Sequence, residues 1–134
     1  MAAYSPPTAL LQVAQHVDDL DRAVAFYRDA LGLRLIATFN PPGLAFIDLG
    51  GVRVMLDAVA EADVPRAILY MQVADIQASY RALQERGVEF IGEPHMINRD
   101  DAGLFGAKGM EEWMAFFKDS EGNTIAIASR VGAE

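Results

Sequence analysis

The chain carries the same short pattern twice, about 56 residues apart. Residues 17–20 (VDDL) close one apolar, strand-like run and open a segment with helical spacing, and residues 73–76 (VADI) do the same later. Both helical segments stop at a glycine, Gly32 or Gly87, and another apolar run follows. A duplication on this scale indicates two copies of one supersecondary unit that share a core. A functional site is therefore expected between the two copies.

Turn signals divide each copy into a strand, a helix and three more strands. The first copy has expected strands at 10–17, 33–39, 44–49 and 52–57, with a helix from 18 or 19 to 32. The second has expected strands at 67–73, 88–91, 112–118 and 123–129, with a helix over 75–86. The glycine-rich stretch 92–111 is predicted to be a long functional loop. These elements predict an α+β fold of two tandem β-α-β-β-β modules, 9–58 and 66–130, joined by a linker at 59–65 and forming a cup-shaped mixed sheet.

Composition narrows the partners. The chain has 134 residues, 52% of them hydrophobic, which suits one compact domain. Its net charge is −8 and its Lys and Arg residues are scattered, so nucleic-acid binding is not expected. It has no cysteine, no run of about 20 apolar residues and no signal-like start, so a soluble cytoplasmic protein without membrane contact is expected.

Because side chains alternate along a strand, each expected strand has two faces. The purely aliphatic faces are expected to pack under the helices, and the mixed faces are expected to line a cup. Arg53 and Asp57 share one strand face and could hold a polar ligand at two points, or form an ordinary exposed pair or internal salt bridge. Tyr70 and Gln72 could offer a ring face and an amide, or Tyr70 could simply support the sheet. Trp113 could form an apolar wall for a flat ligand, with core packing or a subunit interface as the alternative.

The chain has two histidines, a residue type that often acts as a general acid or base. His95 begins the long loop, and a carboxylate at Asp100, Asp101 or Glu112 could make it a general base. The alternative is a solvent-exposed loop histidine. His16 lies at a strand-to-helix junction, where it is expected to hydrogen-bond the backbone.

The layout resembles the vicinal oxygen chelate superfamily, which includes glyoxalase I, methylmalonyl-CoA epimerase, extradiol dioxygenases and the bleomycin- and fosfomycin-resistance proteins. The matching segments are 17–23 (VDDLDRA), 26–27 (FY), 31–33 (LGL) and 114–123 (MAFFKDSEGN). In the last of these, Ser120 stands where the family commonly has proline. The resemblance covers roughly residues 9 to 130, and it implies a homodimer. Its motifs are specific for the fold and say little about the reaction.

The family's enzymes usually hold a divalent metal through one ligand from each of four strands. Carried over by position, the resemblance places these ligands at Gln12, Met55, Ile68 and Ala126. Three of the four side chains lack an oxygen or imidazole donor suited to such a metal. A displaced site built from Gln12, His16, Asp57 and His95 is the alternative; otherwise neither a metal nor a cofactor is expected.

The resulting hypothesis is a glyoxalase/bleomycin-resistance-like protein that binds a small organic molecule in a metal-free cup. The expected ligand-binding residues are Gln12, Arg53, Met55, Asp57, Ile68, Tyr70, Gln72, Trp113 and Ala126. One alternative is a lyase, epimerase or dioxygenase-type enzyme that uses a displaced metal or His95. Another is an interaction protein whose cup is filled by its own Met and aromatic side chains.

Overall fold

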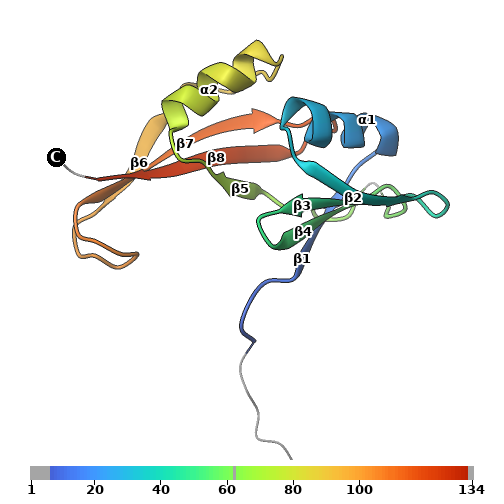
Figure 1. Cartoon of the computed structure of the whole chain (residues 1–134), viewed down its shortest axis with the longest axis horizontal. Coiled ribbons are helices and arrows are strands. Elements are labelled where there is room, and N and C mark those ends of the chain that lie inside the picture. The colour runs from blue at the N-terminus through green and yellow to red at the C-terminus, as the bar shows by residue number, and fades with distance from the viewer. Residues whose placement is uncertain (1–6, 62, 133–134) are drawn as a thin grey trace, which may run out of the picture.

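The computed structural model describes residues 7–61 and 63–132, which form eight strands, two α-helices and one π-helical segment (Figure 1). The first module contains β1 (Gln12–His16), α1 (Leu20–Ala25), η1 (Phe26–Ala30), β2 (Arg34–Phe39), β3 (Leu44–Leu49) and β4 (Val52–Asp57). The second contains β5 (Leu69–Gln72), α2 (Ile76–Glu85), β6 (His95–Asp100), β7 (Met110–Lys118) and β8 (Thr124–Val131). Both modules therefore follow the predicted β-α-β-β-β order.

Each module forms its own four-stranded mixed sheet. Sheet A has the order β1-β4-β3-β2, and sheet B has the order β5-β8-β7-β6. In each sheet the first strand of the module pairs in parallel with the last, and the remaining pairs are antiparallel. The predicted α+β class is confirmed.

The repeated aspartate of the two signatures caps a helix. Asp19 precedes α1 and accepts a hydrogen bond from the backbone N–H of Arg22 at 3.1 Å. Asp75 precedes α2 and accepts one from Ala78 at 3.1 Å. A side-chain oxygen at this position satisfies an amide that the first helical turn leaves unpaired. The duplication therefore encodes helix starts.

The second strand of the second module was predicted wrongly. Residues 88–91 make a single bridge, between Phe90 and Phe117, and the strand instead lies at 95–100 within the expected loop. Val88 is buried and Phe90 half-buried against the core, so their apolar pattern serves packing. β6 lies at the sheet edge, and every side chain in it except Asp100 is exposed, so it carries no apolar alternation to reveal it. The loop shrinks to residues 101–109.

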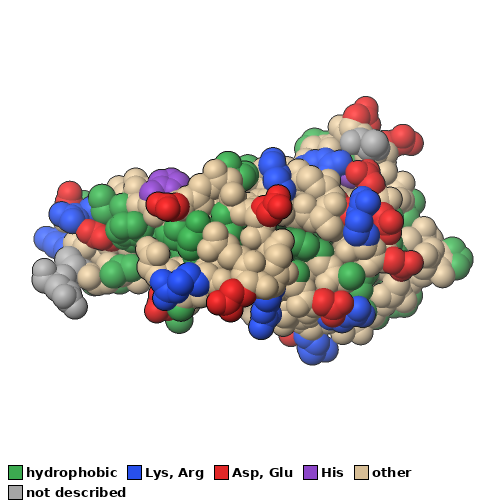
Figure 2. Space-filling view, turned by 90° about the horizontal axis from the view of Figure 1, so that it is seen from above, with side chains coloured by type: hydrophobic (Ala, Val, Ile, Leu, Met, Phe, Trp, Pro, Cys, Tyr) green, Lys and Arg blue, Asp and Glu red, His purple; other side chains and the backbone are tan. Residues whose placement is uncertain are grey.

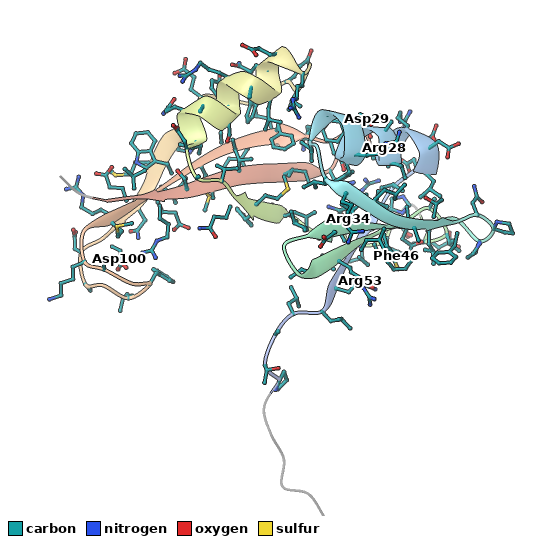
Figure 3. All side chains as sticks on the ribbon, in the orientation of Figure 1. Arg28, Asp29, Arg34, Phe46, Arg53 and Asp100 are labelled. Atoms are coloured by element: carbon teal, nitrogen blue, oxygen red, sulfur yellow. The ribbon has the colours of Figure 1, made fainter. Side chains whose placement is uncertain are left out.

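Both helices lie on the same side of the two sheets, and the core fills the space between (Figure 1). One continuous apolar cluster crosses both modules; for example, the rings of Phe26 and Phe117 lie 6.4 Å apart. The opposite faces of the sheets carry no helix, as the side chains of Arg53 and Phe46 show for sheet A (Figure 3). The loop 101–109 extends on this helix-free side of sheet B.

The face of the molecule drawn in Figure 2 has no patch of like charges. Lys and Arg side chains are scattered among Asp and Glu over this face (Figure 2). Among the described residues, no helix has the length and apolar character required to cross a membrane.

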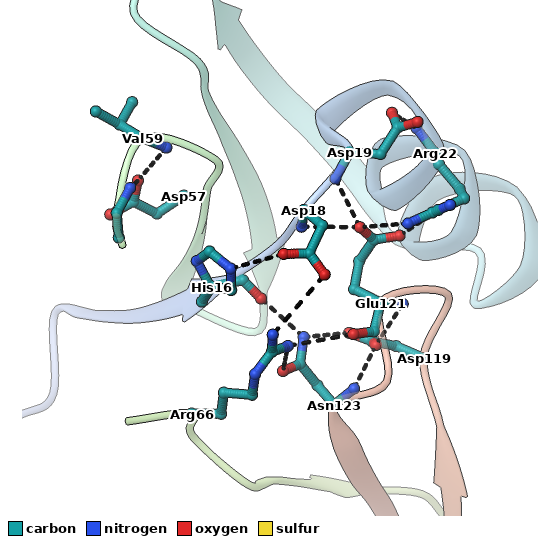
Figure 4. A network of polar contacts seen from close by, with 11 residues as sticks. His16, Asp18, Asp19, Arg22, Asp57, Val59, Arg66, Asp119, Glu121 and Asn123 are labelled. Carbon is teal, nitrogen blue, oxygen red and sulfur yellow. Dashed lines mark hydrogen bonds and ion pairs between the residues drawn. The ribbon is translucent and has the colours of Figure 1, made fainter. Parts of the chain in front are cut away.

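A buried polar network joins the two modules at the hairpin between β7 and β8 (Figure 4). The Glu121 carboxylate accepts hydrogen bonds from the backbone N–H groups of Asp18 and Asp19, at 2.9 and 2.7 Å, and from the Arg22 guanidinium at 2.6 Å. The Asn123 amide donates to the His16 carbonyl at 2.9 Å. The hairpin motif that carries the family resemblance thus holds the second module to the start of α1.

The network continues at the start of the second module. Arg66 donates to Asn123 Oδ1 at 2.7 Å and to the Glu121 carbonyl at 3.2 Å. The amide of buried Gln15 pairs with both backbone groups of Ala67, at 2.6 and 3.0 Å. Since buried polar groups are costly unless paired, these contacts specify one arrangement of the modules.

Candidate functional site

The helix-free face of sheet B carries rows of side chains set by strand register. One row holds Tyr70, Ala126 and Phe116, and the next holds Gln72, Ala128, Met114 and His95. A third row holds Arg130, Glu112 and Asn98. An open groove of about 540 Å³ lies on this face, lined by Tyr70, Gln72, Ile97, Glu112, Met114, Phe116, Ala128, Ser129 and Arg130. We call it the sheet B groove.

The groove is hollow because small residues line a central strand. Ala126 is fully buried and Ala128 is half-buried on β8, between larger side chains on β5 and β7. The rings of Tyr70 and Phe116 meet edge to face at 6.1 Å, and Tyr70 is 54% exposed. Aromatic walls with few polar groups are typical of small-molecule sites.

The polar end of the groove is tied to loop 101–109. Arg130 donates to the Phe105 carbonyl at 2.6 Å, and its other terminal nitrogen lies 3.5 Å from Asp100 Oδ2. The Asp100 carboxylate, at the base of the loop in Figure 3, accepts from the N–H groups of Phe105 and Leu104, both at 2.8 Å. The hydrogen bond from Phe105 has the largest effect on the Asp100 carboxyl. Together with the bond from Leu104, it outweighs the effect of burial and holds the pKa of Asp100 below its usual value. The loop is therefore anchored to the edge of the groove.

The anchored loop presents apolar side chains to solvent. Leu104 and Phe105 are 79% and 68% exposed. Gly106 has a φ of 146°, and a Cβ atom there would lie 3.0 Å from Arg130 Nη1. A side chain at this position would strain the backbone and crowd the Arg130 anchor.

Four of the predicted ligand-binding residues lie on sheet A instead. Gln12 Nε2 lies 3.7 Å from Met55 Sδ, and the Arg53 guanidinium sits 5.8 Å from the centre of the Phe46 ring. Asp57 Oδ1 accepts from the N–H groups of Val59 and Ala60 at 2.9 and 3.0 Å (Figure 4). Asp57 therefore organises the turn after β4 and forms no ion pair with Arg53 within the described residues.

Of the remaining five predicted residues, four lie on sheet B and Ile68 directly precedes its strand β5. Tyr70 and Gln72 line the sheet B groove, and Ala126 occupies the same face. Exposed Ile68 borders a second groove, of about 490 Å³, where Leu10 and Val13 of the first module approach β5. Trp113 points to the helix side, where it packs on the core and donates to Glu111 at 3.0 Å.

The histidines make local contacts. His95 is exposed on β6, with Nδ1 3.2 Å from the Glu93 carbonyl and its ring 6.4 Å from that of Phe116. No carboxylate lies within 4 Å of its ring nitrogens in the described chain. His16 is buried and pairs through Nε2 with Asp18 Oδ1 at 2.9 Å, rather than with the backbone as expected. Its Nδ1 has no partner within residues 7–61 and 63–132.

The side chains at the family's metal positions do not fit a hard divalent ion. Met55, Ile68 and Ala126 offer a thioether and two aliphatic groups, whereas such ions take oxygen or imidazole nitrogen. The alternative set of Gln12, His16, Asp57 and His95 is divided between the two sheets. Within the described ranges, no group of three His, Asp or Glu side chains is placed to hold a metal.

Sequence reasoning missed Arg130 and the placement of Glu112. Arg130 follows Ala126 by four residues on the same strand face, and that spacing is a usable signal. Glu112 was considered as a partner for His95, but it lies opposite Arg130 on the neighbouring strand. Asp100 was also considered as a partner for His95, but its carboxylate accepts from the loop amides of Leu104 and Phe105 and lies beside Arg130.

Two β-α-β-β-β modules, each with its own four-stranded mixed sheet, define a paired-module α+β protein. The chain belongs to the Glyoxalase/Bleomycin resistance protein/Dioxygenase superfamily, whose family model matches residues 9–127. The uncharacterized protein YraH of Bacillus subtilis (strain 168) is 27% identical over 135 residues, which span 88% of this chain and 95% of YraH.

Solved structures agree on the fold. TnmS3, an antibiotic binding protein from Streptomyces sp. CB03234, superposes with a TM-score of 0.74 at 21% identity, over 95% of this chain and 99% of TnmS3. Lactoylglutathione lyase from Agrobacterium tumefaciens superposes with a TM-score of 0.63 at 22% identity, over 93% and 96% of the two chains. One of these relatives is a binding protein and the other an enzyme, so the shared fold does not select a function.

Proposed function

We propose that this protein binds a small organic molecule in the sheet B groove without using a metal. The observation that carries the proposal is a groove of about 540 Å³ with Ala128 at its floor and the Tyr70 and Phe116 rings as its walls. A cavity of that size accommodates a drug-sized molecule. TnmS3 is an example of this fold in an antibiotic binding protein. The lack of oxygen or imidazole donors at Met55, Ile68 and Ala126 favours binding over metal-dependent catalysis.

Filling the floor of the groove is expected to abolish binding. In Ala128→Trp, an indole replaces a methyl group between Gln72 and Met114, so affinity for a neutral aromatic probe should fall at least about tenfold. The probe is 2-(2-naphthyl)ethanol, followed by ligand-observed NMR. Ala78→Trp, on the exposed side of α2, is the matched control and should bind as the original chain does. Equal binding by Ala128→Trp, with its fold intact by circular dichroism, would rule out this groove.

We also propose that two copies associate. Leu10, Leu11, Ile68 and Tyr70 are exposed apolar side chains, and three of them border the groove between the sheets. Covering them with a second copy removes apolar surface from water. Light scattering should give twice the 14.6 kDa mass of the chain, and Ile68→Lys should shift the mass toward one copy. A single-chain mass at every concentration up to about 100 µM would contradict the proposal, since stable interfaces hold together there.

A further inference from the structure

We infer that the sheet B groove selects aromatic ligands that carry a positively charged amino group, and that Glu112 recognises this group. The inference rests on the proposed function and adds the charge and the length of the ligand. Nothing in the family motifs specifies Glu112.

The first observation is that Glu112 is left without a partner. It lies directly opposite Arg130 on β8 and Asn98 on β6, half-buried and on the groove side of β7. Among the described residues it forms no side-chain hydrogen bond, and no cation lies within 4 Å of its carboxylate. A half-buried carboxylate facing an apolar groove is stabilised by a donor or cation that the ligand brings.

The second observation is that the neighbouring cation is already engaged. Arg130 is the only Lys or Arg among the described residues that line the groove. Its guanidinium reaches Asp100 and the Phe105 carbonyl instead of Glu112, its direct cross-strand neighbour. One positive charge thus stands between two carboxylates, which leaves this end of the groove negative. His95 lies one row away from Glu112 on this face.

The charges of Arg99 and Glu111 balance each other on the helix side of sheet B. Glu111 accepts from Arg99 at 2.6 Å, and both lie on the helix side with Trp113. Their pairing leaves no free cation to satisfy Glu112 through the sheet. Asp100 is likewise held by the loop amides and Arg130.

The third observation concerns the aromatic walls. The negative faces of aromatic rings attract cations, so the rings of Tyr70 and Phe116 favour the same charge as Glu112. Phe116 lies four residues along β7 from Glu112, which is roughly 14 Å at about 3.4 Å per residue. A ligand that spans the groove therefore has two or three fused rings at one end and an amino group on a short arm at the other.

The test compares three probes that share a ring system and differ in charge. They are 2-(2-naphthyl)ethylammonium, the neutral 2-(2-naphthyl)ethanol and the anionic 3-(2-naphthyl)propanoate, each titrated at pH 7 in low salt by NMR. The cation should bind about 5- to 10-fold more tightly than the alcohol, because its ammonium group forms a charged hydrogen bond with Glu112. The anion should bind more weakly than both, because its carboxylate is repelled by Glu112. Added salt should reduce the advantage of the cation.

Glu112→Gln keeps the shape of the side chain and removes its charge. It should bring the cation to within about twofold of the alcohol while leaving the affinity for the alcohol unchanged. Glu89→Gln, an exposed position away from the groove, is the control and should keep the preference. An unchanged preference in Glu112→Gln, or tighter binding of the anion, would overturn the inference while the groove remains a binding site. If the alcohol does not bind, or binds equally to Ala128→Trp, the proposed function fails and the inference fails with it.

Discussion

Replacing Asp119 with alanine is expected to lower the free energy of unfolding by about 3–5 kcal/mol, because it removes a buried acceptor that serves four donors. Asp119 is 6% exposed and accepts hydrogen bonds from the Tyr27 hydroxyl at 2.7 Å and from the N–H groups of Glu121 and Asn123 at 2.8 Å. The Asn123 amide donates to it at 2.9 Å. Alanine leaves these donors buried and unpaired.

Urea unfolding followed by circular dichroism measures the loss. Asp101→Ala is the matched control, because Asp101 is exposed and its side chain forms no hydrogen bond within the described residues; it should change stability by less than about 0.5 kcal/mol. Tyr27→Phe removes one of the donors and should cost about 1 kcal/mol. The pKa of Tyr27 is raised mainly by burial and secondly by the nearby Asp119 carboxylate. Its hydroxyl therefore remains protonated and able to donate. A loss below about 1 kcal/mol for Asp119→Ala would show that the network contributes little.

Acid is expected to destabilise the fold through Glu121. Burial alone raises the pKa of this carboxyl, but the bonds from Arg22, from the Asp18 and Asp19 amides and from Ser120 outweigh it and lower the pKa to about 2. Since the folded pKa lies below the unfolded value of 4.5, the contribution is complete above pH 4.5 and is lost as the pH falls toward 2. The shift corresponds to stability on the order of 3 kcal/mol.

Unfolding free energies measured at several pH values between 7 and 2 check this expectation. Glu121→Gln should be less stable than the original chain at pH 7 and should show a shallower fall below pH 4.5. Glu111→Gln is the comparison, because the Glu111 carboxyl is more exposed than that of Glu121. Its pKa is also lowered, mainly by the hydrogen bond from Arg99 and then by that from Trp113. Its effect on the pH dependence should be smaller, since exposed pairs contribute about 0–1 kcal/mol. Parallel curves for the original chain and Glu121→Gln would remove Glu121 as the cause.

The sequence predicted the elements that alternate apolar and polar residues. The hairpin strands 44–49 and 52–57 appear with the predicted bounds, and the helix over 76–85 lies inside the predicted one. Glycine marked the end of the first helix, since Gly32 has a φ of 75°. β6 could not be predicted because an exposed edge strand is held by backbone hydrogen bonds to β7.

The candidate site was only partly predictable. Tyr70, Gln72 and Ala126 were assigned to a ligand-facing surface, and the structure places them on the helix-free face of sheet B. Trp113 lies on the opposite face, because it shares strand parity with buried Ala115 and Phe117. The sequence could not show that Arg130 turns to Asp100 and leaves Glu112 free, since that choice depends on loop 101–109 folding back against β8.

The sequence by itself determined the duplication and the α+β class, because these depend on residue type and spacing along one strand or helix. The tertiary structure decided which residues share a groove. It placed Gln12 and Met55 on one sheet and Tyr70 and Ala126 on the other, and it used Glu121 and Asn123 to join the modules. Register between strands and hydrogen bonds across about 100 residues are set only when the whole core packs, so no local pattern records them.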